Sequence, residues 1–102
     1  VRLYGVGAWE RFEVTHRPAL RFRDRASFEY RDGIIVNPCQ KLDRLGATPY
    51  AFVYLNGPQT HAAIVMGATR PLWRKVVIND RAKGRRRSNY VCPLEAVKFL
   101  AL

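Results

Sequence analysis

Residues 70–87 contain the side chains with the clearest chemical meaning in this chain. Eight of these residues are basic and one, Asp80, is acidic, so the segment carries +7 of the formal net charge of +10. Arg can bind a phosphate through two parallel hydrogen bonds, and Lys adds a point charge. The segment therefore predicts a site for a polyanion, with RNA as the first candidate. We expect phosphate contacts, which position the protein without reading bases, from Arg70, Arg74, Lys75, Arg81, Lys83, Arg85, Arg86 and Arg87.

Two aromatic side chains accompany these basic residues. Trp73 lies in sequence between Arg70 and the pair Arg74 and Lys75, and Tyr90 follows the last arginines. Either ring could stack on a nucleic-acid base. For Trp73 we prefer the alternative that it closes the core at the end of a strand.

The identity of the anionic partner stays open at this level. Arg accounts for fourteen of the 18 basic residues, a bias that suits RNA but that a GC-rich genome would also produce. Clustered positive charge points less specifically to anionic lipid or an acidic protein, and a device that keeps the chain soluble is the remaining alternative.

The sequence contains few candidate residues for catalysis or metal binding. Most of the acidic residues are interleaved with arginines in the first third of the chain, which predicts ion pairs on a solvated face. Cys39, Cys92, His16 and His61 could formally bind zinc, but they lack the usual CxxC or HxxxH spacing, and we expect buried free thiols. We predict no enzyme activity, no cofactor and no small-molecule substrate. No apolar run reaches the roughly 20 residues that a membrane span needs.

A central hairpin is the element expected to carry the basic segment. Residues 50–55 are aromatic and β-branched, and Asn56-Gly57 marks a turn. Pro58 lacks the N–H that would close a two-residue loop, so we predict a four-residue loop, Asn56 to Gln59, with Leu55 opposite Thr60. Both faces of the hairpin are apolar, which predicts cover on both sides by the domain or by a partner.

The remaining pattern predicts short strands, two short helices and a loop. The strands are expected at Trp9–Val14, Leu20–Arg23, Phe28–Arg31, Ile34–Val36 and Leu72–Ile78; the helices at Asn37–Gly46 and after Pro93; and the extended basic loop at 79–89. We predict an α+β fold, mainly antiparallel β, as a small open β-barrel or meander of about six short strands with about two short helices. Residues 1–102 are expected to form a single small domain.

These features favour an RNA-binding structural subunit of a large ribonucleoprotein that also contacts neighbouring proteins. The most specific form is a mitochondrial ribosomal protein that contacts rRNA phosphates through its Arg-rich loop. Val1 in place of an initiator Met is compatible with a removed presequence and predicts the mitochondrial matrix, or otherwise the cytoplasm. One alternative is a non-catalytic accessory subunit of a multi-protein complex, such as a respiratory or ATP synthase assembly. Another is a small barrel that binds single-stranded DNA or RNA.

Overall fold

The computed structural model describes residues 12–38, 44, 48–80 and 84–102. These residues form seven strands and two 3₁₀ segments. The strands are β1 Phe12–His16, β2 Ile34–Pro38, β3 Ala51–Leu55, β4 His61–Met66, β5 Arg74–Asp80, β6 Arg85–Cys92 and β7 Val97–Ala101. The 3₁₀ segments are η1 Gly67–Leu72 and η2 Leu94–Ala96. The described chain is therefore mainly β, as the sequence pattern predicts.

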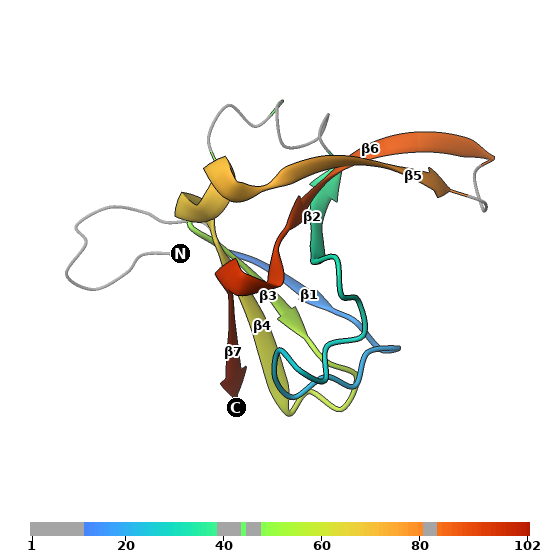
Figure 1. Ribbon diagram of the computed structural model, residues 1–102. Helices are drawn as coiled ribbons and strands as arrows, with labels where there is room; N and C mark the ends of the chain where they lie inside the picture. Colours follow the sequence, from blue (N-terminus) through green and yellow to red (C-terminus); the bar gives the residue numbers. More distant parts are fainter. Residues whose placement is uncertain (1–11, 39–43, 45–47, 81–83) are drawn as a thin grey trace.

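The strands pair into two separate open sheets, rather than into the one open barrel or meander that the sequence predicts. One sheet has the strand order β1-β3-β4-β7 and the other has the order β2-β6-β5. Figure 1 shows the four-stranded sheet in the lower half of the molecule and the β5–β6 hairpin along its top. The β1–β3 pair is parallel, whereas the other described pairs are antiparallel. The chain reaches this parallel pairing because it passes through the second sheet between β1 and β3.

Strand β1 continues beyond the predicted Trp9–Val14 strand, the first part of which lies outside the described residues. It includes Thr15 and His16, which we expected to interrupt it and which pair with β3. The Arg17 N–H also donates to a β3 carbonyl at 2.9 Å. Pro18 has no N–H and cannot extend this ladder. Proline therefore ends the strand, but later in the sequence than predicted.

The two strands predicted at Leu20–Arg23 and Phe28–Arg31 are wrong, although the predicted alternation of burial is present in the first of them. Phe22 is fully buried, while the arginines on either side of it are exposed. The backbone between the two segments makes local bonds instead of a strand ladder. The Ser27 N–H donates to Asp24 Oδ1 at 2.9 Å, and the Asp24 N–H donates to Ser27 Oγ at 3.1 Å. Such side-chain partners compete with strand pairing for the same backbone groups.

The structure contradicts the second of the two predicted helices and the predicted start of the first, whose described residue Arg44 is helical. Asn37 and Pro38, expected to start the first helix, are the last residues of β2, and most of the predicted helix lies outside the described residues. The helix predicted after Pro93 is replaced by η2 and β7. Val97 and Phe99, two residues apart, both pack on the core, as alternate residues of a strand do. Strand β7 pairs with an edge of β4. An available strand edge therefore outweighs the weak helical pattern of this segment.

The β3–β4 hairpin is present, but its predicted register is wrong by two residues. Leu55 lies opposite Ala62 instead of Thr60. The Asn56 N–H donates to the His61 carbonyl at 3.0 Å, so Asn56 belongs to the paired part of the hairpin. A shift of two residues keeps each side chain on its predicted face of the sheet. The predicted apolar faces of the hairpin are therefore correct, although the position of the turn is not.

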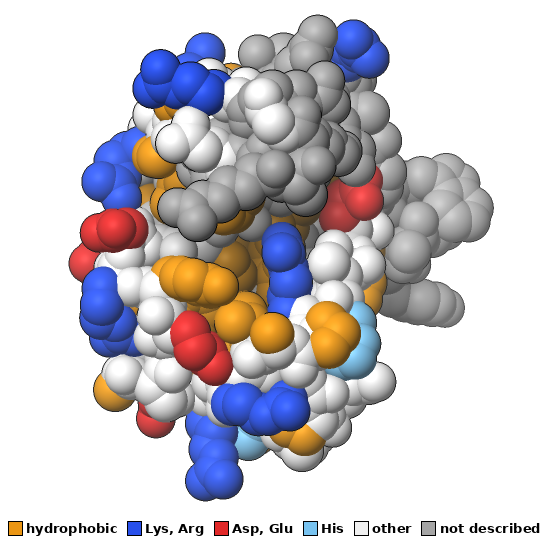
Figure 2. All heavy atoms as spheres, turned by 90° about the vertical axis from the view of Figure 1, so that its right-hand side faces the viewer, with side chains coloured by type: hydrophobic (Ala, Val, Ile, Leu, Met, Phe, Trp, Pro, Cys, Tyr) orange, Lys and Arg blue, Asp and Glu red, His pale blue; other side chains and the backbone are white. Residues whose placement is uncertain are grey.

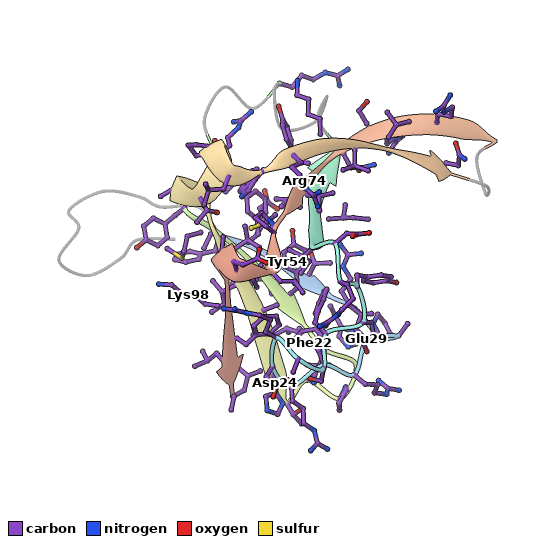
Figure 3. The ribbon with its side chains drawn as sticks, viewed as in Figure 1. Phe22, Asp24, Glu29, Tyr54, Arg74 and Lys98 are labelled. Carbon is purple, nitrogen blue, oxygen red and sulfur yellow. The ribbon has the colours of Figure 1, made fainter. Side chains whose placement is uncertain are left out.

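The core lies between the two sheets and under the irregular segment that follows β1. Figure 3 shows Phe22 and Tyr54 in the interior, among side chains from several strands. The Tyr54 hydroxyl, on β3, donates to the Val36 carbonyl of β2 at 2.9 Å and so connects the two sheets. The buried cluster consists of Leu20, Phe22, Phe28, Ile34, Val36, Phe52, Tyr54, Ala63, Val65, Trp73, Tyr90, Cys92, Leu94 and Val97.

Candidate nucleic-acid interface

Most of the predicted basic loop, residues 79–89, is part of a β-hairpin, so the loop prediction is wrong for the described residues. Strand β5 starts at Arg74 rather than at Leu72 and runs to Asp80, and β6 starts at Arg85. Residues 81–83 lie outside the described part of the chain. Within the described pairs of this hairpin, no basic residue lies opposite another. The register pairs Asp80 with Arg85, Asn79 with Arg86 and Ile78 with Arg87.

This register explains how a strongly charged segment can form a strand. Repulsion between like charges along residues 79–89 would favour the extended loop that the sequence predicts. Directly opposed like charges destabilise a strand pair, whereas these arginines oppose polar, acidic or apolar residues. Successive arginines on β6 also point to opposite faces, which separates their charges. Backbone hydrogen bonds can therefore form despite the net charge.

The outer half of the hairpin projects beyond its neighbours. Strand β2 pairs with Asn89–Cys92 of β6 and does not extend to Arg85–Ser88. We call Val77–Asp80 of β5 together with Arg85–Ser88 of β6 the basic arm. Figure 1 shows this arm extending away from the rest of the molecule. The molecule is correspondingly elongated, with principal extents of 45 × 32 × 22 Å.

Five of the eight predicted phosphate contacts lie on β5 or β6. Arg74, Lys75 and Arg86 are exposed, and Arg87 is half-buried. Arg85 is part of β6, but its side chain is outside the description, as are Arg81 and Lys83 altogether. Figure 2 shows Lys and Arg side chains spread around one face of the molecule rather than gathered in a single cluster.

Arg70 lies in η1 and is tied into the fold. Its Nη1 donates to Thr48 Oγ1 at 2.7 Å, and its Nη2 lies 3.5 Å from the Tyr90 hydroxyl. Its guanidinium carbon is also 5.2 Å from the centre of the Tyr90 ring. These contacts give Arg70 a structural role at the base of the arm, in addition to any role in binding.

Trp73 and Tyr90, which the sequence offers as possible stacking residues, lie in the core. Each is only 8% exposed. The Trp73 ring lies 5.8 Å from Phe52 and 6.0 Å from Tyr90, and its Nε1 donates to Thr69 Oγ1 at 2.9 Å. A base needs an accessible ring face to stack upon. The preferred alternative for Trp73, closure of the core beside a strand, is confirmed.

The two basic residues at the start of β5 are held in different ways. Arg74 Nη2 donates to the Asp32 carbonyl at 2.6 Å, and Figure 3 shows Arg74 between β5 and β2. Lys75 Nζ lies 5.6 Å from the centre of the Tyr90 ring, within range of a cation–π interaction. Both side chains remain exposed, so both can still meet an anion.

The sequence analysis missed two polar residues that share a face with Arg86. Asn79 lies directly opposite Arg86, and Ser88 is two residues further along the same strand. Both are exposed and can donate hydrogen bonds to phosphate oxygens. Reading residues 85–92 with a period of two would have indicated this face, but the density of charge suggested a loop.

The outer face of the four-stranded sheet is the other large surface feature. Phe52 and Tyr54 point into the core, as one face of the predicted hairpin requires. The opposite face has half-buried residues such as Val53 and Ile64. On the neighbouring strands, Val14 is 63% exposed and Leu100 is 52% exposed. The second face is therefore apolar and only partly covered.

Three of the four groups considered for zinc binding are described and lie in different environments, whereas Cys39 lies outside the described residues. Cys92 is buried in the core, and burial raises the pKa of its thiol. His16 and His61 instead bond to residues of the β3–β4 loop. Among the described residues, no group of three or more His, Cys, Asp and Glu is placed to hold a metal ion.

Two acidic residues of the first third, Asp24 and Glu29, make local hydrogen bonds. Glu29 Oε2 accepts the Arg21 N–H at 2.5 Å. Hydrogen bonds from the side chain and backbone of Ser27 lower the pKa of the exposed Asp24 carboxyl. These carboxylates therefore stabilise turns between β1 and β2.

In the described part of the chain, no helix has the length and apolar composition needed to cross a membrane. Comparisons with protein-family models, with curated proteins and with solved structures find no match for this chain.

Proposed function

We propose that this chain is an RNA-binding structural subunit of a large ribonucleoprotein. Its most specific form is a ribosomal protein, in the mitochondrial matrix or otherwise in the cytoplasm. One observation carries the proposal: the segment with a net charge of +7 contributes to a projecting two-stranded arm. Of the basic residues of this segment, Arg85, Arg86 and Arg87 lie on the arm, and Arg74 and Lys75 lie at its base.

The arm would act mainly through the phosphate backbone. Exposed arginines such as Arg86 can replace condensed counterions around RNA, and the release of those ions favours binding. Pairing between β5 and β6 already orders the backbone, so less conformational entropy is lost than with a free loop. Because Trp73 and Tyr90 are buried, the proposal includes no stacking on bases by these two rings.

The dependence of binding on salt tests this proposal. We compare wild type with the triple variant Arg85→Gln, Arg86→Gln and Arg87→Gln on a fragment of ribosomal RNA. Each lost phosphate contact makes the slope of log K against log salt shallower by about 0.7 to 0.9, so the triple variant should change it by about 2 to 3. Circular dichroism spectra should show that the variant remains folded.

A control variant removes the same charge elsewhere. Arg23, Arg25 and Lys98 are exposed residues outside the basic arm, and all three are changed to Gln. This control should keep most of the wild-type slope. Equal slopes for the arm variant and wild type would contradict RNA binding by the arm.

The apolar outer face of the four-stranded sheet favours a second candidate, an accessory subunit of a multi-protein complex. Exposed Val14 and Leu100 beside half-buried Val53 and Ile64 form a surface suited to a protein neighbour. Such a subunit should stay with its complex after nuclease treatment, whereas a subunit held mainly by RNA should be released. The small single-strand-binding barrel is not retained, because the sheets are open and both candidate stacking rings are buried.

A further inference from the structure

The basic arm presents arginine on both of its faces. Arg86 and Arg87 are neighbours on β6, and neighbouring residues of a strand point to opposite sides. In the register of the hairpin, Arg86 lies opposite Asn79 and Arg87 lies opposite Ile78. A sequence of consecutive arginines thus becomes two separate basic surfaces.

The same division continues at the base of the hairpin. Lys75 lies opposite Tyr90, and counting in steps of two places both on the face of Arg86. Arg74 lies opposite Val91, on the face of Arg87. Each face therefore carries a basic residue near the body and another on the arm. Strand geometry puts the residues of each such pair about 13 Å apart along the hairpin.

A one-sided contact would use only half of this charge. If the arm lay flat on one RNA backbone, phosphates would neutralise the basic side chains on the face toward the RNA. The basic side chains on the other face would stay in water. The two sets of charge lie on opposite sides of the same two-stranded ribbon, and they repel each other across it. Phosphates on both sides would relieve the repulsion between them.

We propose that the basic arm inserts between two backbone segments of a folded RNA. This inference rests on the proposed function in RNA binding. The major groove of a regular RNA helix is deep and narrow and admits side chains poorly. A helical junction, or two helices packed side by side, separates the backbones enough for a two-stranded ribbon. The ligand is then a folded RNA with two converging backbones, and Arg86 and Arg87 contact different ones.

Two matched single variants test this arrangement, Arg86→Gln and Arg87→Gln. They are adjacent and lose the same charge, but they change opposite faces of the arm, and Arg87 is half-buried whereas Arg86 is exposed. The full chain is bound to a three-way-junction RNA and to a straight duplex built from the same helices, and both complexes are probed with hydroxyl radicals. Wild type should bind the junction more tightly and protect two separate backbone tracts on it.

Each variant should lose one of the two tracts. Arg86→Gln should remove protection of one tract, Arg87→Gln should remove protection of the other, and each should make the salt slope shallower by about 1. Lys75→Gln should resemble the former and Arg74→Gln the latter. Loss of the same tract in both variants, or equal binding to duplex and junction with a single protected tract, would overturn insertion while leaving RNA binding intact. If wild type binds neither RNA, the proposed function fails as well.

Discussion

The buried side chain of Asn56 gives the sharpest test of how the body of this protein is held together. Asn56 is 1% exposed. Its Nδ2 donates to the Phe22 carbonyl at 3.0 Å, and its Oδ1 accepts the N–H groups of Thr60 at 2.8 Å and of His61 at 3.2 Å. One amide therefore joins the β3–β4 loop to the segment that follows β1.

We expect Asn56→Ala to lower the free energy of unfolding by about 3 kcal/mol. Each of the three backbone bonds contributes about 1 kcal/mol net, and a buried backbone group left without its partner adds to the loss. With a urea m-value of about 1 to 3 kcal/mol/M, the unfolding midpoint should fall by about 1 to 3 M. Equilibrium unfolding followed by tryptophan fluorescence measures this shift, because Trp73 is buried in the core.

Asn79→Ala is the matched control, since it makes the same change at an exposed position of β5. It should alter stability by no more than about 0.5 kcal/mol. A loss below about 1 kcal/mol for Asn56→Ala, or equal losses in the two variants, would refute the role that we assign to Asn56.

Two further stability predictions follow from single residues. Gln59 has a positive φ of 59°, which strains any residue except glycine, so Gln59→Gly should stabilise the protein by about 0.5 kcal/mol in thermal unfolding. Burial raises the pKa of Tyr54 above its ordinary value of 10.0, so the unfolded state loses this proton first and stability falls as the pH rises through and above that value. Denaturant titrations of wild type and Tyr54→Phe should show a loss of up to about 1.4 kcal/mol per pH unit that the variant lacks. A pH dependence that is identical in the two proteins would show that Tyr54 is not protected from ionisation.

The strands of the central hairpin could be predicted because their composition and their burial agree. Aromatic and β-branched residues fill β3, and the alternation between faces places Phe52 and Tyr54 in the core. The register was harder to predict. Pro58 excludes a two-residue loop, but the position of the longer loop depends on Asn56, whose side chain bonds to groups across the turn. A tertiary contact with Phe22 helps to hold Asn56 there, and local turn rules do not include it.

The C-terminal segment shows how a neighbouring edge can decide between two patterns. Leu94, Val97 and Leu100 have a spacing that fits a helical face, and Val97 and Phe99 equally fit a strand face. Pairing with β4 selects the strand. The sequence alone does not reveal that β4 has an edge available at this point.

The basic residues of the candidate site could be predicted from the sequence, but the β-hairpin that carries them could not. The cluster of arginines is the main concentration of charge in the sequence, and its prediction as a loop considered only the charges along the chain. That reasoning omitted the opposite strand, which places Asn79 and Asp80 across from Arg86 and Arg85. The two stacking candidates failed for a related reason, because sequence proximity to basic residues does not indicate on which side of a sheet an aromatic ring lies.

The order of strands in the larger sheet has a consequence for how the protein folds. Only β3 and β4 are neighbours both in sequence and in space, while β1 and β7 join the outer edges from distant parts of the chain. Pairing between distant segments loses more chain entropy and is slower to form. We therefore expect the β3–β4 hairpin to form early and the two outer strands to be added late. Folding-rate measurements should show φ-values that are higher in β3 and β4 than in β1 and β7, and a reversed order would contradict this sequence of events.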